Sequence, residues 1–202
     1  PDLSMTTSLN TAFSGCNRLT ENASFNEWDV SKVTHMESMF RGSNFNSDIS
    51  DWDISSVTHM GGMFMNSNFN GDVSNWNTGN LKNISDVFRG TPFNGDISNW
   101  DVSKVWDMRE MFWESEFNGD ISNWNVSNVW RMYGMFYAIT LPTEYYDEML
   151  IKWSELPLRH GVLFDAGDSK YSAKAVEART KMIKEFDWTI FDGGMEEATD
   201  EE

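Results

Sequence analysis

The stretch "FNGDISNWDVSKVWDM" at residues 93–108 decides the fold, because the chain repeats it almost unchanged. Close copies stand at 45–60 ("FNSDISDWDISSVTHM"), 69–84 ("FNGDVSNWNTGNLKNI") and 117–132 ("FNGDISNWNVSNVWRM"). Repetition with a fixed period of 24 residues is typical of proteins in which each unit buries its apolar residues against its neighbours. The four copies therefore predict a stack of equivalent units.

The apolar residues of these units recur in four columns with a spacing of 24 residues. No single unit can bury its large side chains alone, whereas stacked units align each column into a continuous apolar ridge. Methionines that recur with this period are interpreted as gap-filling core residues, with a metal-binding methionine cluster as the alternative. The columns are Trp28, Trp52, Trp76, Trp100 and Trp124; Val33, Val57, Leu81, Val105 and Val129; Met36, Met60, Ile84, Met108 and Met132; and Phe40, Phe64, Phe88, Phe112 and Phe136.

Each unit divides into two halves with different patterns. The "DISNW" half has the short, β-branched character of a strand. In "SKVWDMREMF" (103–112) the apolar residues recur at spacings of three and four, which predicts a short helix. Ser103 and its equivalents occupy the N-cap position, and Gly42, Asn66 and Gly90 lie where a left-handed residue would end the helix. With a truncated first unit, residues 1–140 are predicted to form an α/β repeat solenoid, leucine-rich-repeat-like, of about six coils of 24 residues.

After Phe136 the repeat pattern stops. The end of a solenoid exposes its apolar columns and needs a cap with a polar outer face, so residues 141–194 are predicted to form a small α/β C-terminal cap. The acidic tail, 195–202, has almost no apolar residues and is predicted to be disordered. Within the cap the sequence predicts helices at 143–153 and 172–186 and strands at "GVLFDAG" (161–167) and "WTIF" (188–191).

The repeat "FNGDISNWDVSKV…MREMF" resembles that of BspA-type leucine-rich-repeat surface proteins, which also occurs in mycoplasma surface lipoproteins. The resemblance covers about residues 1–140, and residues 145–194 resemble the module that often closes such repeats. It implies a non-enzymatic protein at the cell surface or outside the cell, with its signal or anchor expected outside this stretch. The implied function is adhesion or the binding of a protein or glycan on another surface. A structural spacer or packing unit of a surface layer or virion, in contact with copies of itself, is the alternative.

Charge and motifs narrow the functional classes further. The net charge of −17 argues against nucleic acid as a partner, since nucleic-acid binding needs a basic patch. No apolar run has the length of a transmembrane segment. The chain has one cysteine, and it contains neither a glycine-rich phosphate loop nor a nucleophile motif. We therefore expect no enzymatic activity and no cofactor.

Two columns of polar residues could hold a metal ion. His35 and His59 lie one repeat apart and are expected to be neighbours, either as a surface pair or as two metal ligands. The second column consists of aspartates, whose stacking is repulsive unless something offsets it. Either calcium binds between the coils, or each carboxylate accepts hydrogen bonds from backbone N–H groups in a tight turn. The aspartates are Asp48, Asp72, Asp96 and Asp120.

Five aromatic residues of the last two units fall outside the core columns. At the same positions, earlier units carry mostly Thr, Lys, Arg, Glu or Gly, so the stacking of the units does not itself require aromatic residues there. On the predicted helix, residues seven apart would be superposed and would point away from the core. Such a patch suits the binding of sugar rings or of a protein partner, unless the cap folds over it. The candidate binding residues are Trp106, Trp113, Trp130, Tyr133 and Tyr137.

Overall fold

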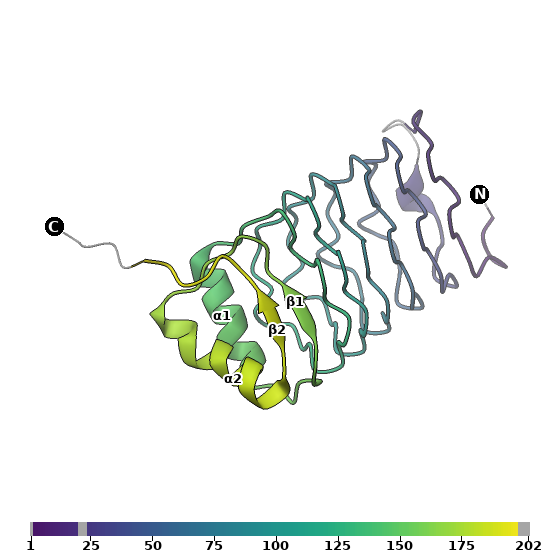
Figure 1. Ribbon diagram of the computed structural model, residues 1–202. Coiled ribbons are helices and arrows are strands. Elements are labelled where there is room, and N and C mark those ends of the chain that lie inside the picture. Colours follow the sequence, from purple (N-terminus) through teal and green to yellow (C-terminus); the bar gives the residue numbers. More distant parts are fainter. Residues whose placement is uncertain (1, 20–23, 198–202) are drawn as a thin grey trace.

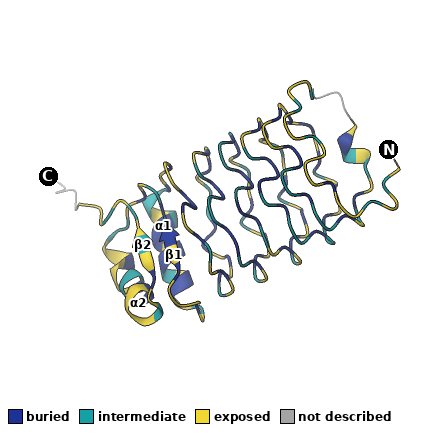
Figure 2. Ribbon diagram, turned by 45° about the vertical axis from the view of Figure 1, so that its right-hand side comes forward, coloured by how far each residue is buried: buried dark blue, intermediate teal, exposed yellow. Residues whose placement is uncertain are grey.

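The computed structural model describes residues 2–19 and 24–197. Up to about residue 140, the chain follows a mostly irregular path in which successive windings lie side by side (Figure 1). The first winding lies at one end of this array, and the helices of the C-terminal segment lie at the other (Figure 1). Buried and exposed residues alternate along the windings (Figure 2).

Neighbouring windings are joined by parallel backbone contacts, which together form a ladder along the chain. His35 pairs with His59, His59 pairs with Asn83, and the same pairing continues to Arg131 in steps of 24 residues. Around each pair, alternate N–H groups donate to the next winding; the N–H of Met36, for example, donates to the carbonyl of His59 at 2.9 Å. The backbone therefore keeps the 24-residue period that the sequence predicted.

The predicted helix and strand of each unit are wrong. Between residues 29 and 140, the described chain contains isolated bridges and turns but no α-helix or extended strand. Two residues per unit, four positions apart, adopt left-handed backbone conformations, which an α-helix of L-residues cannot contain. The first set is Ser38, Gly62, Asp86, Glu110 and Gly134, and the second is Gly42, Asn66, Gly90, Glu114 and Ala138.

The hydrogen bonds explain why this path replaces a helix. The N–H of Phe112 donates to the carbonyl of Met135 in the next winding, and the N–H of Trp113 donates to Glu110 three residues back. The i to i−4 bonds of a helix are therefore not made. Ser103 is not an N-cap, because its own N–H donates to the carboxylate of Asp101 at 2.9 Å. The left-handed conformations expected at Gly42, Asn66 and Gly90 are nevertheless confirmed.

The four columns form one buried cluster, rich in aromatic residues. Phe64 stacks on Phe88 with ring centroids 5.9 Å apart, and Phe88 stacks on Phe112 at 6.0 Å. The indole N–H of Trp100 donates to the carbonyl of Val73 at 3.0 Å, so this large side chain is buried without an unpaired donor. Trp52, Trp76 and Trp124 donate in the same way. The column methionines are also buried, as the core interpretation predicts.

The column aspartates, and asparagines two positions before them, accept hydrogen bonds from backbone N–H groups. The carboxylate of Asp72 accepts a hydrogen bond from the N–H of Ser74 at 2.9 Å, and the other three aspartates accept from the serine two residues later. Asn70 accepts from the N–H of Asn94 at 3.1 Å, across two windings. The hydrogen bonds from the serines lower the pKa values of Asp48, Asp72 and Asp96. The predicted backbone hydrogen bonds of the aspartate column are thus confirmed.

The C-terminal segment contains the regular elements that the sequence predicted. They are α1 (Thr143–Ser154), β1 (Leu163–Asp165), α2 (Val176–Phe186) and β2 (Thr189–Phe191). A short 3-10 helix at Ala173–Ala175 precedes α2, and another, at Phe25–Glu27, lies near the start of the chain. Strand β1 continues the ladder, since Phe164 pairs with Met132, and β2 pairs with β1 in parallel. None of the described helices has both the length and the apolar character that crossing a bilayer needs.

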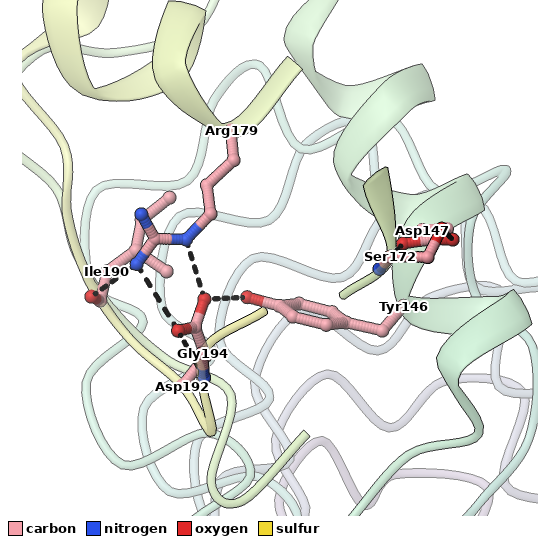
Figure 3. Close-up of polar contacts among 7 residues, drawn as sticks. All are labelled: Tyr146, Asp147, Ser172, Arg179, Ile190, Asp192 and Gly194. Atoms are coloured by element: carbon pink, nitrogen blue, oxygen red, sulfur yellow. Dashed lines mark hydrogen bonds and ion pairs between the residues drawn. The ribbon is translucent and has the colours of Figure 1, made fainter. Parts of the chain in front are cut away.

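A partly buried ion pair ties these elements together (Figure 3). The carboxylate of Asp192 accepts from Arg179 Nε of α2 at 2.8 Å and from the hydroxyl of Tyr146 of α1 at 2.7 Å. Burial and the Asp192 charge raise the pKa of Tyr146. Beyond β2, Met195 still pairs with Tyr171, so ordered chain extends into the predicted tail, of which residues 198–202 lie outside the described residues.

Candidate binding surface on the last two repeats

The five predicted aromatic residues lie together on the last two windings; we call them the aromatic surface. Trp130, Tyr133 and Tyr137 are 50%, 41% and 45% exposed, which is unusual for large apolar side chains in this molecule. Trp106 and Trp113 are half-buried. The C-terminal segment therefore leaves a large part of Trp130, Tyr133 and Tyr137 exposed, contrary to the alternative in which the cap folds over them.

The aromatic rings pair between windings rather than within one. Trp106 stacks on Trp130 with centroids 5.6 Å apart and ring planes 17° apart, and Trp113 stacks on Tyr137 at 3.9 Å and 23°. The predicted superposition of Trp106 and Trp113 depended on a helix that does not form. The ladder instead places residues 24 positions apart next to each other. The result is two stacks of two rings each, with Tyr133 as the fifth ring of the aromatic surface.

Arginine side chains lie on the indole rings, a feature that sequence reasoning missed. The guanidinium carbon of Arg131 is 4.4 Å from the ring centroid of Trp130 and 5.7 Å from that of Trp106. Arg89 lies 4.8 Å from the Trp113 ring. The signal was present in the repeat, since Arg89 precedes Trp113 by 24 residues and Arg131 directly follows Trp130. Cation–π contacts of this kind hold the rings in place.

Carboxylates form ion pairs with these arginines. Asp107 is fully buried, and its Oδ2 lies 3.2 Å from Arg109 Nε and 3.5 Å from Arg131 Nη1. Arg89 pairs with Glu110 and, at 3.5 Å, with Asp86. Burial raises the pKa of Asp86, with a further contribution from the Glu110 charge. The aromatic surface thus rests on a network in which the positive charges are already paired.

The histidine pair takes its predicted place on a neighbouring part of the ladder. The rings of His35 and His59 stack with centroids 5.0 Å apart and parallel planes. Each ring Nδ1 lies 2.8 Å from the hydroxyl of the preceding residue, Thr34 or Thr58. Within the described residues, no group of three or more histidine, cysteine or acidic side chains is arranged to hold a metal ion.

The comparison with known proteins agrees with the repeat. One family model matches the chain twice, at residues 7–114 and 68–156, and the two overlapping matches together cover well over half of its length. No curated protein and no solved structure matches the chain. The chain belongs to the family described as Mycoplasma protein of unknown function, DUF285.

Proposed function

We propose that the chain is a leucine-rich-repeat-like solenoid of the BspA type and acts as a non-enzymatic binding module at the cell surface. The aromatic surface would contact a protein or glycan on another surface. One observation carries the proposal: three large aromatic side chains on the last winding are 41–50% exposed, although the ladder does not need them. Contiguous exposed apolar residues of this kind mark interaction sites.

The internal repeat supplies the comparison that supports this interpretation. Thr34 and Thr58 hold the positions of Trp106 and Trp130 in earlier windings, and the backbone pairing there is the same. The aromatic residues therefore add nothing that the ladder lacks elsewhere. Aromatic rings bury a large area at a low cost in side-chain entropy, which suits them to binding surfaces.

No catalytic step belongs to the proposal, because the charged groups beside the rings are used in pairing. Asp107 is matched by Arg109 and Arg131, and Glu110 is matched by Arg89. A general acid or base needs a group that is free to exchange a proton with a substrate. The paired groups are better suited to holding the rings still.

Replacing both indoles of one stack tests the proposal. The change is Trp106→Ala with Trp130→Ala, and the matched control is Thr34→Ala with Thr58→Ala, at the same repeat positions. We expect the tryptophan variant to lose binding to host cells or to a glycan array while its melting temperature falls by only a few degrees. The control should keep full binding.

Two results would contradict the proposal. Retained binding in the tryptophan variant would remove the aromatic surface from the function. Loss of cooperative unfolding would assign the indoles to the core instead. The alternative, a spacer or packing unit, predicts self-association, which sedimentation of the native chain at rising concentration would detect.

A further inference from the structure

An open pocket of about 390 Å³ lies at the C-terminal end of the aromatic surface. Its lining comes from the last winding, from β1 and the turn after it, and from β2. Only Tyr137 belongs to the predicted binding residues; Phe191 contributes a second ring and is 55% exposed. The lining residues are Tyr137, Ala138, Asp165, Gly167, Asp168 and Phe191.

The backbone holds the floor of this pocket rigidly. Gly167 has a left-handed conformation, and any side chain there would collide with the carbonyls of Phe136 and Ile139. Its N–H donates to Asp165 Oδ1 at 2.9 Å, and the N–H of Asp168 donates to the carbonyl of Ile139 at 3.1 Å. The Asp165 carboxylate and the backbone that carries Asp168 are therefore placed by the fold before any ligand arrives.

The pocket carries negative charge that the chain itself does not neutralise. Neither Asp165 nor Asp168 forms a salt bridge within residues 2–19 and 24–197, a part that contains every Lys and Arg of the chain. In the same part, no guanidinium lies over the ring of Tyr137 or Phe191. This is where the pocket differs from the rest of the surface, whose indoles carry Arg89 and Arg131.

We propose that this pocket binds the basic side chain, arginine or lysine, of a protein partner. A cation placed there would meet two aromatic rings and two carboxylates, as Arg131 and Arg89 meet a ring and an acid beside it. The net charge of −17 attracts such a partner from solution.

The partner is a protein because the pocket is continuous with a larger surface. Tyr137 lines the pocket and also stacks on Trp113, so a ligand in the pocket would touch the end of the aromatic surface. One basic side chain would anchor a partner whose other residues cover Trp130 and Tyr133. This inference rests on the proposed function and names the class of partner.

The probe for this inference is a tetra-arginine peptide with blocked ends, titrated into the whole chain by calorimetry at physiological salt. The first variant is Phe191→Ala, and the second is Asp165→Asn with Asp168→Asn, in which each amide oxygen can still accept a hydrogen bond. The matched controls are Met5→Ala, an exposed apolar residue far from the pocket, and Glu116→Gln with Glu185→Gln, which changes the net charge equally.

We expect the peptide to bind the native chain about fivefold more tightly than the Phe191→Ala variant and about tenfold more tightly than the double asparagine variant. The Met5 control should bind like the native chain, and the charge control should lose less than about threefold. Equal losses in the double asparagine variant and its charge control would overturn the inference, since binding would then follow net charge alone. Equal binding by native and Phe191→Ala chains would also overturn it.

A parallel binding assay separates this inference from the proposed function. One outcome is that Trp106→Ala with Trp130→Ala abolishes cell binding while the peptide binds the pocket variants as tightly as the native chain. That outcome would support the aromatic surface and show that the pocket does not bind a basic side chain. A neutral oligosaccharide whose binding depends on Phe191 would overturn the basic anchor in favour of a glycan. Thermal unfolding of each variant confirms that the measured chains are folded.

Discussion

The molecule divides its tryptophans into two kinds, and one substitution made at both kinds tests this division. Trp100 is buried, packs between Trp76 and Phe88, and donates its indole N–H to the carbonyl of Val73. Trp130 is half exposed and contacts mainly the Trp106 ring and the Arg131 guanidinium. Replacement of each by alanine should therefore have very different costs.

The magnitudes follow from these contacts. Trp100→Ala removes a buried ring, at about 3–5 kcal/mol. It also removes one hydrogen bond to the Val73 carbonyl, which still accepts from the N–H of Trp76 at 3.3 Å, at about 0.5–1.5 kcal/mol more. Trp130→Ala removes one ring stack of about 0.5–1.5 kcal/mol and one cation–π contact of about 0.5–1 kcal/mol. The free energy of unfolding should fall by at least about 1 kcal/mol more for Trp100 than for Trp130.

Urea denaturation followed by far-ultraviolet circular dichroism measures both values without depending on tryptophan fluorescence. The slope with denaturant should stay unchanged in the two variants, because the unfolding unit is the same. A cost for Trp130→Ala that equals the cost for Trp100→Ala would refute the division. In that case the exposed indoles would belong to the core, and the argument for a binding surface would lose its basis.

Three further predictions concern the ion pair and the aspartate column. Arg179→Met should destabilise the chain by about 3 kcal/mol, because Asp192 stays buried without its cation, whereas Lys181→Met on the same helix should cost below about 1 kcal/mol in urea denaturation. Because the pKa of Asp72 is lowered in the folded chain, its stabilising contribution is present above about pH 4 and is lost as the pH falls through the folded-state pKa. Between about pH 5 and pH 2, the melting temperature of the Asp72→Asn variant should therefore fall less than that of the native chain. Exchange of EDTA for millimolar calcium should leave the melting temperature within about 1 °C, since the aspartates already bond to the turns, and a rise of several degrees would instead support calcium between the windings.

Much of the fold could be predicted because burial follows the repeat. Trp, Met and Phe columns recur every 24 residues whatever path the backbone takes between them, so the core residues were identifiable from spacing alone. The path of the backbone could not be predicted, because apolar spacings of three and four arise both from a helix and from a winding with two left-handed residues. Glu110 and Asp86 adopt this conformation without being glycine, so the sequence carried no warning there.

The candidate site was predictable in its residues but not in its contacts. The aromatic residues stood out against Thr34, Thr58 and Lys82 at equivalent positions. Their partners depend on the pairing of windings, which a helical reading places wrongly. Phe191 could not be predicted as part of the site for another reason. It lies near Tyr137 only because β2 pairs with β1, and it is far from Tyr137 in the sequence.

Exchange of the whole aromatic surface for the residues of earlier windings tests the central claim most directly. The chain itself supplies the replacements, so the ladder is kept: Trp106→Thr, Trp113→Arg, Trp130→Thr, Tyr133→Ser and Tyr137→Arg. The measurement is the affinity of this chain and of the native chain for the same cells or immobilised partner. We predict that the exchanged chain unfolds cooperatively and no longer binds, and equal affinity of the two chains would contradict the claim that this surface carries the function.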